Sequence, residues 1–291
     1  MVEYAKTEHK VSTRQALRIF DIQPSVYYYK PKKTDDQSVR DSLADLAASH
    51  TRWGFWMMHN HLRGLNFKWN HKKVYRIYQA MGLNLRRKTK KRLPARVVEP
   101  LLWPIGPNIT WSMDFMADTL QNGVSYRSLN IIDDHNREGL TITMDVSLSS
   151  KRVIRELDNL IAWRGAPQCI RVDNGPEFIA AGLADWAKKR GVELKFIEPG
   201  KPYQNGYVER FNKSFREEVL DAYCFERIKE AQVMAHAWLW MYNNVRPHSA
   251  LGYKTPVAFL AERRKGFLGA FPSFVQNASE DWQSLVKNVS N

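Results

Sequence analysis

Residues 109–146 read ITWSMDFMADTLQNGVSYRSLNIIDDHNREGLTITMDV, and this stretch predicts three consecutive antiparallel strands. The strands are expected at 109–120, 124–134 and 139–146, because each segment is rich in strand-forming residues and is bounded by turn residues. Asn122-Gly123 is a preferred dipeptide of tight hairpin turns, so it should join the first strand to the second. The sheet of this protein is therefore expected to begin as an antiparallel meander.

The chain after residue 146 alternates helical and strand patterns. We expect a helix from Ser149 or Ser150 through Trp163, a strand at Cys169–Val172, a helix at Phe178–Arg190 and a strand at Glu193–Ile197. Adding these two strands to the meander predicts an α/β fold with a mixed five-stranded sheet and flanking helices.

Two further helices are expected beyond the loop at residues 199–202. The first carries Glu209, and the second runs from about Ile228 to Tyr242. The second is rich in large side chains, Trp238, Trp240 and Met241, which we assign to the core first and to stacking on DNA second.

Three carboxylates in distinct contexts are the candidate catalytic residues. Asp114 lies inside the first strand, Asp173 follows the short strand before an Asn-Gly-Pro turn, and Glu209 lies on a helix with 35 residues between it and Asp173. A charge inside a strand is costly unless a cation compensates it. Carboxylates that converge in space can hold two divalent metals against a phosphodiester, and such hard oxygen ligands favour Mg²⁺ or Mn²⁺ over zinc. Other acids are left out of this set: Asp118, Asp133, Asp134, Asp145 and Glu177.

The N-terminal third of the chain is strongly basic. Residues 1–100 hold 21 Lys and Arg against 8 Asp and Glu, so +13 of the formal net charge of +14 falls there. Clustered positive charge favours nucleic acid through phosphate contacts and counterion release, although a basic chain can also be merely soluble.

Two small helical modules are expected in this basic region. Residues 1–33 contain a helix-turn-helix-like pair, in which Ser12 and Gln15 form a capping box and Pro24 begins the next helix. A plain helical hairpin with Tyr27–Tyr29 in its core is the alternative. Residues 34–84 should form a second module, whose last helix opens near Asn70, turns Val74, Ile77, Tyr78 and Met81 inward, and carries Lys72, Lys73 and Arg76 on its other face.

A basic, proline-rich linker is expected at residues 85–108, followed by the core at 109–265 and a weakly organised tail at 266–291. Six of the seven residues from Arg86 to Arg92 are basic, and these predict contact with a DNA backbone: Arg86, Arg87, Lys88, Lys90, Lys91 and Arg92. Lys213 and Arg216 follow Glu209 at helical spacing, and with Lys201 they are further candidates for binding phosphate. A solvated charged surface is the alternative in each case.

Composition excludes several classes of protein. The sequence has no apolar run of the roughly 18 residues needed to cross a bilayer and no secretory signal in residues 1–20, so we expect a cytoplasmic protein. Cys169 and Cys224 lack the spacing of a zinc finger or a disulfide framework, and we expect both to be reduced and partly buried. His248 is assigned to packing rather than to DNA.

At four motifs the chain resembles the DDE transposases of bacterial insertion sequences, of the OrfB type, whose catalytic core is similar to that of retroviral integrases. The motifs are Trp111-Ser-Met-Asp114, Arg171-Val-Asp173-Asn-Gly-Pro-Glu-Phe178, Pro199-Gly-Lys-Pro-Tyr-Gln-Asn-Gly-Tyr-Val-Glu209-Arg-Phe-Asn212 and Tyr242-Asn-Asn-Val-Arg-Pro-His-Ser-Ala-Leu-Gly252. The resemblance covers about residues 10–260.

The resemblance implies an RNase H-like core in which Asp114, Asp173 and Glu209 bind two Mg²⁺ ions. It also implies cleavage at the element's ends, strand transfer by the freed 3′-hydroxyl, assembly of several copies on double-stranded DNA, and an upstream-frame partner or fusion. One departure is Trp53-Gly-Phe-Trp-Met57, where relatives usually carry Tyr-Gly-Tyr-Arg-Arg, so two arginines are missing from the second module. A DNA-binding accessory protein without catalysis and a nuclease that cuts without joining are the alternatives.

Overall fold

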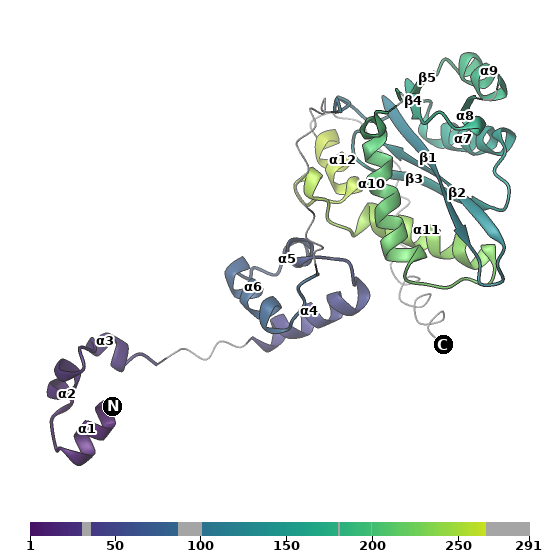
Figure 1. The fold of residues 1–291 in the computed structure, drawn as a ribbon. Coiled ribbons are helices and arrows are strands. Elements are labelled where there is room, and N and C mark those ends of the chain that lie inside the picture. The colour runs from purple at the N-terminus through teal and green to yellow at the C-terminus, as the bar shows by residue number, and fades with distance from the viewer. Residues whose placement is uncertain (31–35, 87–100, 180, 199, 266–291) are drawn as a thin grey trace. The chain divides into compact units, whose positions relative to one another are not determined.

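The computed structural model describes residues 1–30, 36–86, 101–179, 181–198 and 200–265 (Figure 1). By its internal contacts the chain divides into two compact units, Met1–Ser42 and Leu43–Asn291. This division falls inside helix α4 (Gln37–Ser49) rather than at either end of the predicted second module. The domain boundaries given above therefore stay predictions.

The first unit begins with three short helices, α1 (Val2–Glu8), α2 (Thr13–Ile19) and α3 (Pro24–Tyr27). The predicted capping box is confirmed, because the Gln15 N–H donates to Ser12 Oγ at 3.2 Å and the Ser12 N–H donates to Gln15 Oε1 at 3.1 Å. Pro24 occupies the first turn of α3, as predicted.

Helix α1 was not predicted, and it supplies half of the small core of the first unit. Val2 and Ala5 of α1 pack with Ala16 and Leu17 of α2. The alternative with a tyrosine core is wrong for two of the three residues, because Tyr28 and Tyr29 are 65% and 72% exposed.

Beyond residue 43, the chain first forms the remainder of α4, then α5 (Phe55–Gly64) and α6 (His71–Ala80). Helix α6 begins as predicted, since Asn70 Oδ1 accepts the Lys72 N–H at 2.8 Å. It ends before Gly82, which adopts a φ of +68°. Val74, Ile77 and Tyr78 are buried, as expected from their spacing. Helix α5 was not predicted, although its buried residues Phe55, Met58 and Leu62 recur at helical spacing.

The region after residue 108 is built on a five-stranded mixed sheet with the order β3-β2-β1-β4-β5. The strands are β1 (Thr110–Thr119), β2 (Ser125–Asp133), β3 (Gly139–Asp145), β4 (Cys169–Val172) and β5 (Glu193–Phe196). Strands β1, β2 and β3 are antiparallel, whereas β4 runs parallel to both β1 and β5. The predicted sheet is confirmed to within two residues at every strand end.

The hairpin between β1 and β2 sets the register of the sheet. The Gly123 N–H donates to the Leu120 carbonyl at 2.9 Å, and Gly123 has a φ of +84°, a conformation that favours glycine. This turn pairs Asp114 of β1 with Asn130 of β2.

Helices cover the two faces of the sheet (Figure 1). On one face, α7 (Ser150–Arg164) and α9 (Ala181–Arg190) pack against the main apolar core. Toward the other face, α10 (Gly206–Phe215) contacts β1 and β2, and α11 (Ile228–Asn244) contacts β3. A Cβ atom at Gly139 would lie 2.6 Å from Phe211 of α10 and 2.4 Å from Leu239 of α11, so glycine allows both helices to approach β3.

Three helix predictions need correction. The helix expected at Phe178–Arg190 starts two residues early, because Pro176 begins α8 (Pro176–Ile179), and α9 ends at Arg190 as predicted. Helix α11 extends two residues beyond the predicted end. A further helix, α12 (Pro256–Lys265), was not predicted, and the expected tail lies outside the described residues.

The core assignment of the large α11 side chains is borne out for Trp238 and Met241, which are 1% and 4% exposed, while Trp240 is half-buried. Cys169 is buried as expected, but Cys224 is exposed, so the expectation that both are partly buried is wrong for Cys224. Within the described residues, no helix is long and apolar enough to cross a bilayer.

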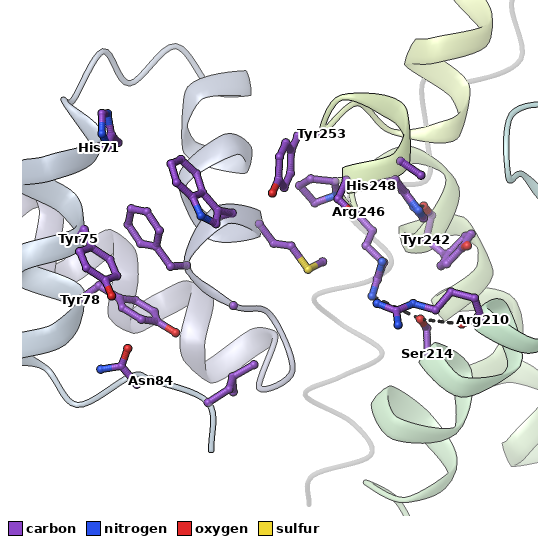
Figure 2. Close-up of a pocket in the computed structure, with 18 of the residues that line it drawn as sticks. His71, Tyr75, Tyr78, Asn84, Arg210, Ser214, Tyr242, Arg246, His248 and Tyr253 are labelled. Atoms are coloured by element: carbon purple, nitrogen blue, oxygen red, sulfur yellow. Dashed lines mark hydrogen bonds between the residues drawn. The ribbon is translucent and has the colours of Figure 1, made fainter. Parts of the chain in front are cut away.

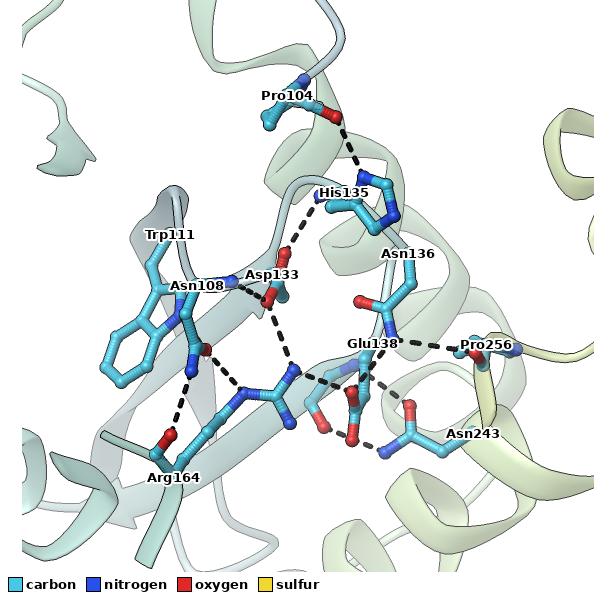
Figure 3. A network of polar contacts seen from close by, with 11 residues as sticks. Pro104, Asn108, Trp111, Asp133, His135, Asn136, Glu138, Arg164, Asn243 and Pro256 are labelled. Carbon is cyan, nitrogen blue, oxygen red and sulfur yellow. Dashed lines mark hydrogen bonds and ion pairs between the residues drawn. The ribbon is translucent and has the colours of Figure 1, made fainter. Parts of the chain in front are cut away.

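A buried polar network joins one edge of the sheet to α7, α11 and α12 (Figure 3). Arg164 at the end of α7 donates to Asp133 Oδ2 at 3.1 Å and to Glu138 Oε2 at 2.8 Å. Asn108 accepts from Arg164 Nε at 2.9 Å, and its backbone N–H donates to Asp133. Asn243 of α11 bonds both backbone groups of Gly139. Asp133 therefore has a structural role in holding this network together.

Candidate active site

Asp114 lies in the middle of β1 and faces α10. Side chains alternate along a strand, and the neighbouring Met113 and Phe115 belong to the apolar core on the α7 side. The Asp114 carboxylate is half-buried and accepts two hydrogen bonds: Oδ1 from the Phe115 N–H at 2.8 Å, and Oδ2 from Asn212 Nδ2 of α10 at 2.8 Å.

The pKa of Asp114 is raised from 3.8 to about 6. Burial is the main cause, and the negative charges of Asp173 and Glu209 raise the pKa further, while the hydrogen bonds from Phe115 and Asn212 act in the opposite direction. Asp114 therefore lies within electrostatic range of both other acids, which come from distant parts of the chain.

Asp173 is held in the turn that follows β4. Its Oδ1 accepts the Gly175 N–H at 3.1 Å, and the side chain is half-buried. A Cβ atom at Gly175 would lie 3.0 Å from the same oxygen, so a larger residue would crowd the carboxylate. Phe178 of α8 stacks on Phe115 with ring centroids 4.9 Å apart, which fixes the turn beside the strand of Asp114.

Glu209 lies in the first turn of α10 and is exposed. Partial burial of its carboxyl nevertheless raises its pKa. Position in the first helical turn is favourable for an anion, because the helix dipole is positive there.

The three predicted acids differ from the acids that were left out. In the described parts of the chain, none of the three has a Lys, Arg or His within ion-pair distance. The five excluded acids all have an arginine partner: Asp118 with Arg216, Asp133 with Arg164, Asp134 with Arg171, Asp145 with Arg152 and Glu177 with Arg127. The described residues contain no group of three or more His, Cys, Asp or Glu side chains that could hold a metal ion as they stand. Convergence of the three acids on metal ions therefore remains a prediction.

Three predicted phosphate-binding cations near Glu209 are engaged by carboxylates. Lys201 lies 2.7 Å from Glu198, Lys213 lies 3.7 Å from Glu217, and Arg216 Nη1 lies 3.2 Å from Asp118 Oδ2. Helix α10 ends at Phe215, and a π-helical turn, η2 (Arg216–Leu220), follows. Phosphate binding by these three cations stays a prediction.

The other predicted cations lie before the core. On α6, Lys72 and Arg76 are exposed and Lys73 is half-buried; Arg86 is exposed. The rest of the basic linker lies outside the described residues: Arg87, Lys88, Lys90, Lys91 and Arg92.

Two residues on α10 that the sequence did not single out lie next to one of the predicted acids each. Asn212 bonds Asp114, and Arg210 is exposed next to Glu209. Figure 2 shows Arg210 with Ser214 and Arg246: Ser214 Oγ donates to the Arg210 carbonyl at 3.1 Å, and Arg246 Nη2 donates to Ser214 Oγ at 3.5 Å. Asn212 stands inside the quoted Glu209 motif, but spacing alone does not reveal its partner.

His248 packs, as predicted. It is buried, one ring nitrogen lies 3.2 Å from the Tyr242 carbonyl oxygen, and burial lowers its pKa to about 3. The histidine is therefore neutral at physiological pH.

Known proteins share this arrangement of sequence. Two models described as integrase core domain match residues 105–202 and 190–256, and a model described as HTH-like domain matches residues 35–91. An insertion element IS407 protein of Burkholderia multivorans is 38% identical over 255 residues, which are 87% of this chain and 92% of the relative. An insertion element IS476 protein of Xanthomonas euvesicatoria is 37% identical over 87% of this chain and 74% of the relative.

A more distant relative carries a functional name. The transposase for insertion sequence element IS904 of Lactococcus lactis is 25% identical over 68% of this chain and 76% of the relative. With its mixed five-stranded sheet, its flanking helices and its N-terminal helical segments, the chain belongs to the OrfB-type DDE transposases of bacterial insertion sequences, which have an RNase H-like integrase core.

Proposed function

We propose that this transposase cleaves DNA at the ends of its insertion sequence and joins the freed 3′-hydroxyl to target DNA, with Asp114, Asp173 and Glu209 as the catalytic carboxylates. The observation that carries the proposal is the state of Asp114. Its carboxylate is half-buried, is opposed by the charges of the other two acids, and has no basic side chain to compensate it among the described residues. A fold tolerates such a charge at a cost, which a bound cation removes.

The donor set fits divalent magnesium or manganese. All three candidate ligands are carboxylates, which are hard oxygen donors, and we propose that together they hold two ions. When bound, such ions activate the attacking oxygen and stabilise the leaving oxygen of a phosphodiester. The side chains must draw closer than they stand in this structure, so we expect metal and DNA to gather them.

The chain's own groups support this chemistry in two ways. The Phe115 N–H and the Asn212 amide orient the two oxygens of Asp114, and the Gly175 N–H orients Asp173. In cleavage, water attacks phosphorus and the bond to the 3′-oxygen breaks, leaving a 3′-hydroxyl. In strand transfer, that hydroxyl attacks a target phosphodiester and displaces its 3′-oxygen, so the number of phosphodiester bonds is conserved.

We further propose where DNA lies on the protein. The exposed cations of α6, Lys72 and Arg76, with Lys73 and the basic segment from Arg86 to Arg92, would bind phosphates. Such contacts hold DNA without reading its sequence. We propose that several copies assemble on double-stranded element ends and target DNA, with or without a product of an upstream frame, at the bacterial nucleoid.

Neutral isosteres of the three acids test the assignment. Asp114→Asn, Asp173→Asn and Glu209→Gln should each abolish Mg²⁺-dependent cleavage of an element-end duplex while binding of that duplex persists. Asp185→Asn, a substitution of an exposed acid on α9, is the matched control and should cleave normally. Cleavage by any of the three isosteres would overturn the assignment, and failure of the wild type to cleave with its upstream partner supplied would favour an accessory DNA-binding role.

A further inference from the structure

Two buried asparagines stand behind the Asp114 carboxylate. Asn130 of β2 is fully buried and is the register partner of Asp114 across the hairpin. Its Nδ2 donates to Oδ1 of Asn212 at 2.7 Å, and Asn212 Nδ2 donates to Oδ2 of Asp114 at 2.8 Å. The three side chains form a continuous amide relay from the second strand through α10 to the first strand.

The direction of this relay is set by the carboxylate. An ionised aspartate only accepts hydrogen bonds, so Asn212 must present its NH₂ group to Asp114 and its oxygen to Asn130. Asn130 in turn must present its own NH₂ group, so its buried Oδ1 has no partner among the residues that the structure describes. Reversing either amide would oppose two acceptors or two donors. An unpaired buried oxygen on Asn130 is thus the consequence of a donor that is directed at Asp114.

The relay also joins two of the proposed ligands. Asn212 follows Glu209 by three residues, and both lie on α10, which contacts β1 and β2. A hydrogen bond from Asn212 to Asp114 therefore fixes how α10 is rotated about its axis and where it lies along β1, at the turn that carries Glu209.

We propose that Asn212 is a positioning residue for the metal site: through the relay from Asn130 it holds the Asp114 carboxylate in one orientation and keeps Glu209 in register with it. This inference rests on the proposed function, because it assigns an orienting role toward ions that the three acids would hold. Groups that orient a metal ligand typically contribute about 10- to 100-fold to metal affinity or activity.

The test measures Mn²⁺ binding to the full chain without DNA, from the loss of the free-ion signal in electron paramagnetic resonance. Asn212→Leu keeps a similar volume but removes the amide, and it should weaken Mn²⁺ binding about 10- to 100-fold. The matched control is Asn205→Leu. Asn205 is also buried next to α10 and donates to β1, but to the Met113 carbonyl at 3.4 Å rather than to a carboxylate. This control should leave Mn²⁺ affinity within about twofold of the wild type, while thermal melting reports its effect on stability.

A second substitution tests the relay itself. Asn130→Ala should weaken Mn²⁺ binding in the wild-type background but add nothing to Asn212→Leu, because Asn130 acts only through Asn212. Should Asn212→Leu fail to fold, Asn212→Ala takes its place in both comparisons.

The outcomes separate this inference from the proposed function. Loss of Mn²⁺ binding in Asp114→Asn, together with wild-type binding in a folded Asn212 variant, would overturn the positioning role alone. Unchanged Mn²⁺ binding in Asp114→Asn would overturn the metal assignment itself. Additive effects of the Asn130 and Asn212 substitutions would exclude the relay and leave each asparagine with a separate packing role.

Discussion

The charge on Asp114 should destabilise the metal-free fold, and Asp114→Asn should expose that cost. The pKa of Asp114 in the folded chain, about 6, lies above its ordinary value of 3.8. Between these values the folded chain binds more protons than the unfolded chain, so stability falls as pH rises through this window. A difference of this size corresponds to about 3 kcal/mol, of which about 2 kcal/mol develops between roughly pH 4.5 and 7.5.

Two contributions to the free energy of unfolding differ between Asp114→Asn and the wild type: one from a hydrogen bond and one from the charge of the carboxylate. Asparagine cannot accept at both positions, so the hydrogen bond from Asn212 is lost or strained at every pH, at a cost of about 1 kcal/mol. The electrostatic term changes with pH, whereas the hydrogen-bond term does not. We therefore expect the melting temperature of the variant, relative to the wild type, to rise by about 4–8 °C from roughly pH 4.5 to 7.5.

The assay is thermal melting of both proteins in metal-free buffer at several pH values, with Asp185→Asn as the control. A difference in melting temperature that is the same at both ends of the range would refute the reasoning, because the carboxylate would then not be desolvated in the folded state. Adding Mg²⁺ at neutral pH should stabilise the wild type and leave Asp114→Asn unchanged, since only a state that binds the ion gains from it.

Three further changes have effects that follow from the structure. Gly139→Ala should destabilise the core by about 1–3 kcal/mol, seen in denaturant unfolding, because its Cβ would overlap Phe211 and Leu239. Arg164→Met should cost about 3–5 kcal/mol in the same assay, because it leaves Asp133, which is fully buried, without its cation. Replacing the six basic residues from Arg86 to Arg92 with glutamine should weaken binding to every DNA sequence and make the binding constant less dependent on salt concentration. An unchanged salt dependence would show that the linker does not contact DNA.

Much of the sheet could be predicted because its signals are local. Strand composition and the Asn122-Gly123 turn predict β1 and β2, although the observed loop is one residue longer than that dipeptide, because Leu120 pairs with Val124. Helix α6 was predicted from its Asn70 cap, the inward spacing of its apolar residues and Gly82. By contrast, α1 is seven residues long and depends on packing against α2, which sequence patterns do not report.

The candidate site, too, could be predicted only where its signals are local. The three acids stand in distinctive local contexts, so their selection needed no coordinates. The partners of the predicted cations could be found only from coordinates, because a lysine or arginine binds whichever carboxylate the fold brings nearest. Arg216 illustrates this: its sequence spacing from Glu209 predicts a phosphate contact, but in the structure it binds Asp118 and the Ala117 carbonyl.

Asn130 and Asn212 show that strand pairing and helix packing bring together residues that the sequence motifs do not connect. The observed pairing of Leu120 with Val124 places Asn130 opposite Asp114, whereas a two-residue turn at Asn122-Gly123 would place Ile131 there. Nothing in the sequence says that the space between Asp114 and Asn130 is filled by a residue 82 positions after Asn130. The fold places both amides where they serve an ionised Asp114, and it leaves one buried amide oxygen without a partner among the described residues. A core selected for stability alone would place an apolar pair there. The retained polarity is best explained if this part of the sheet is built around the charge of Asp114 rather than in spite of it.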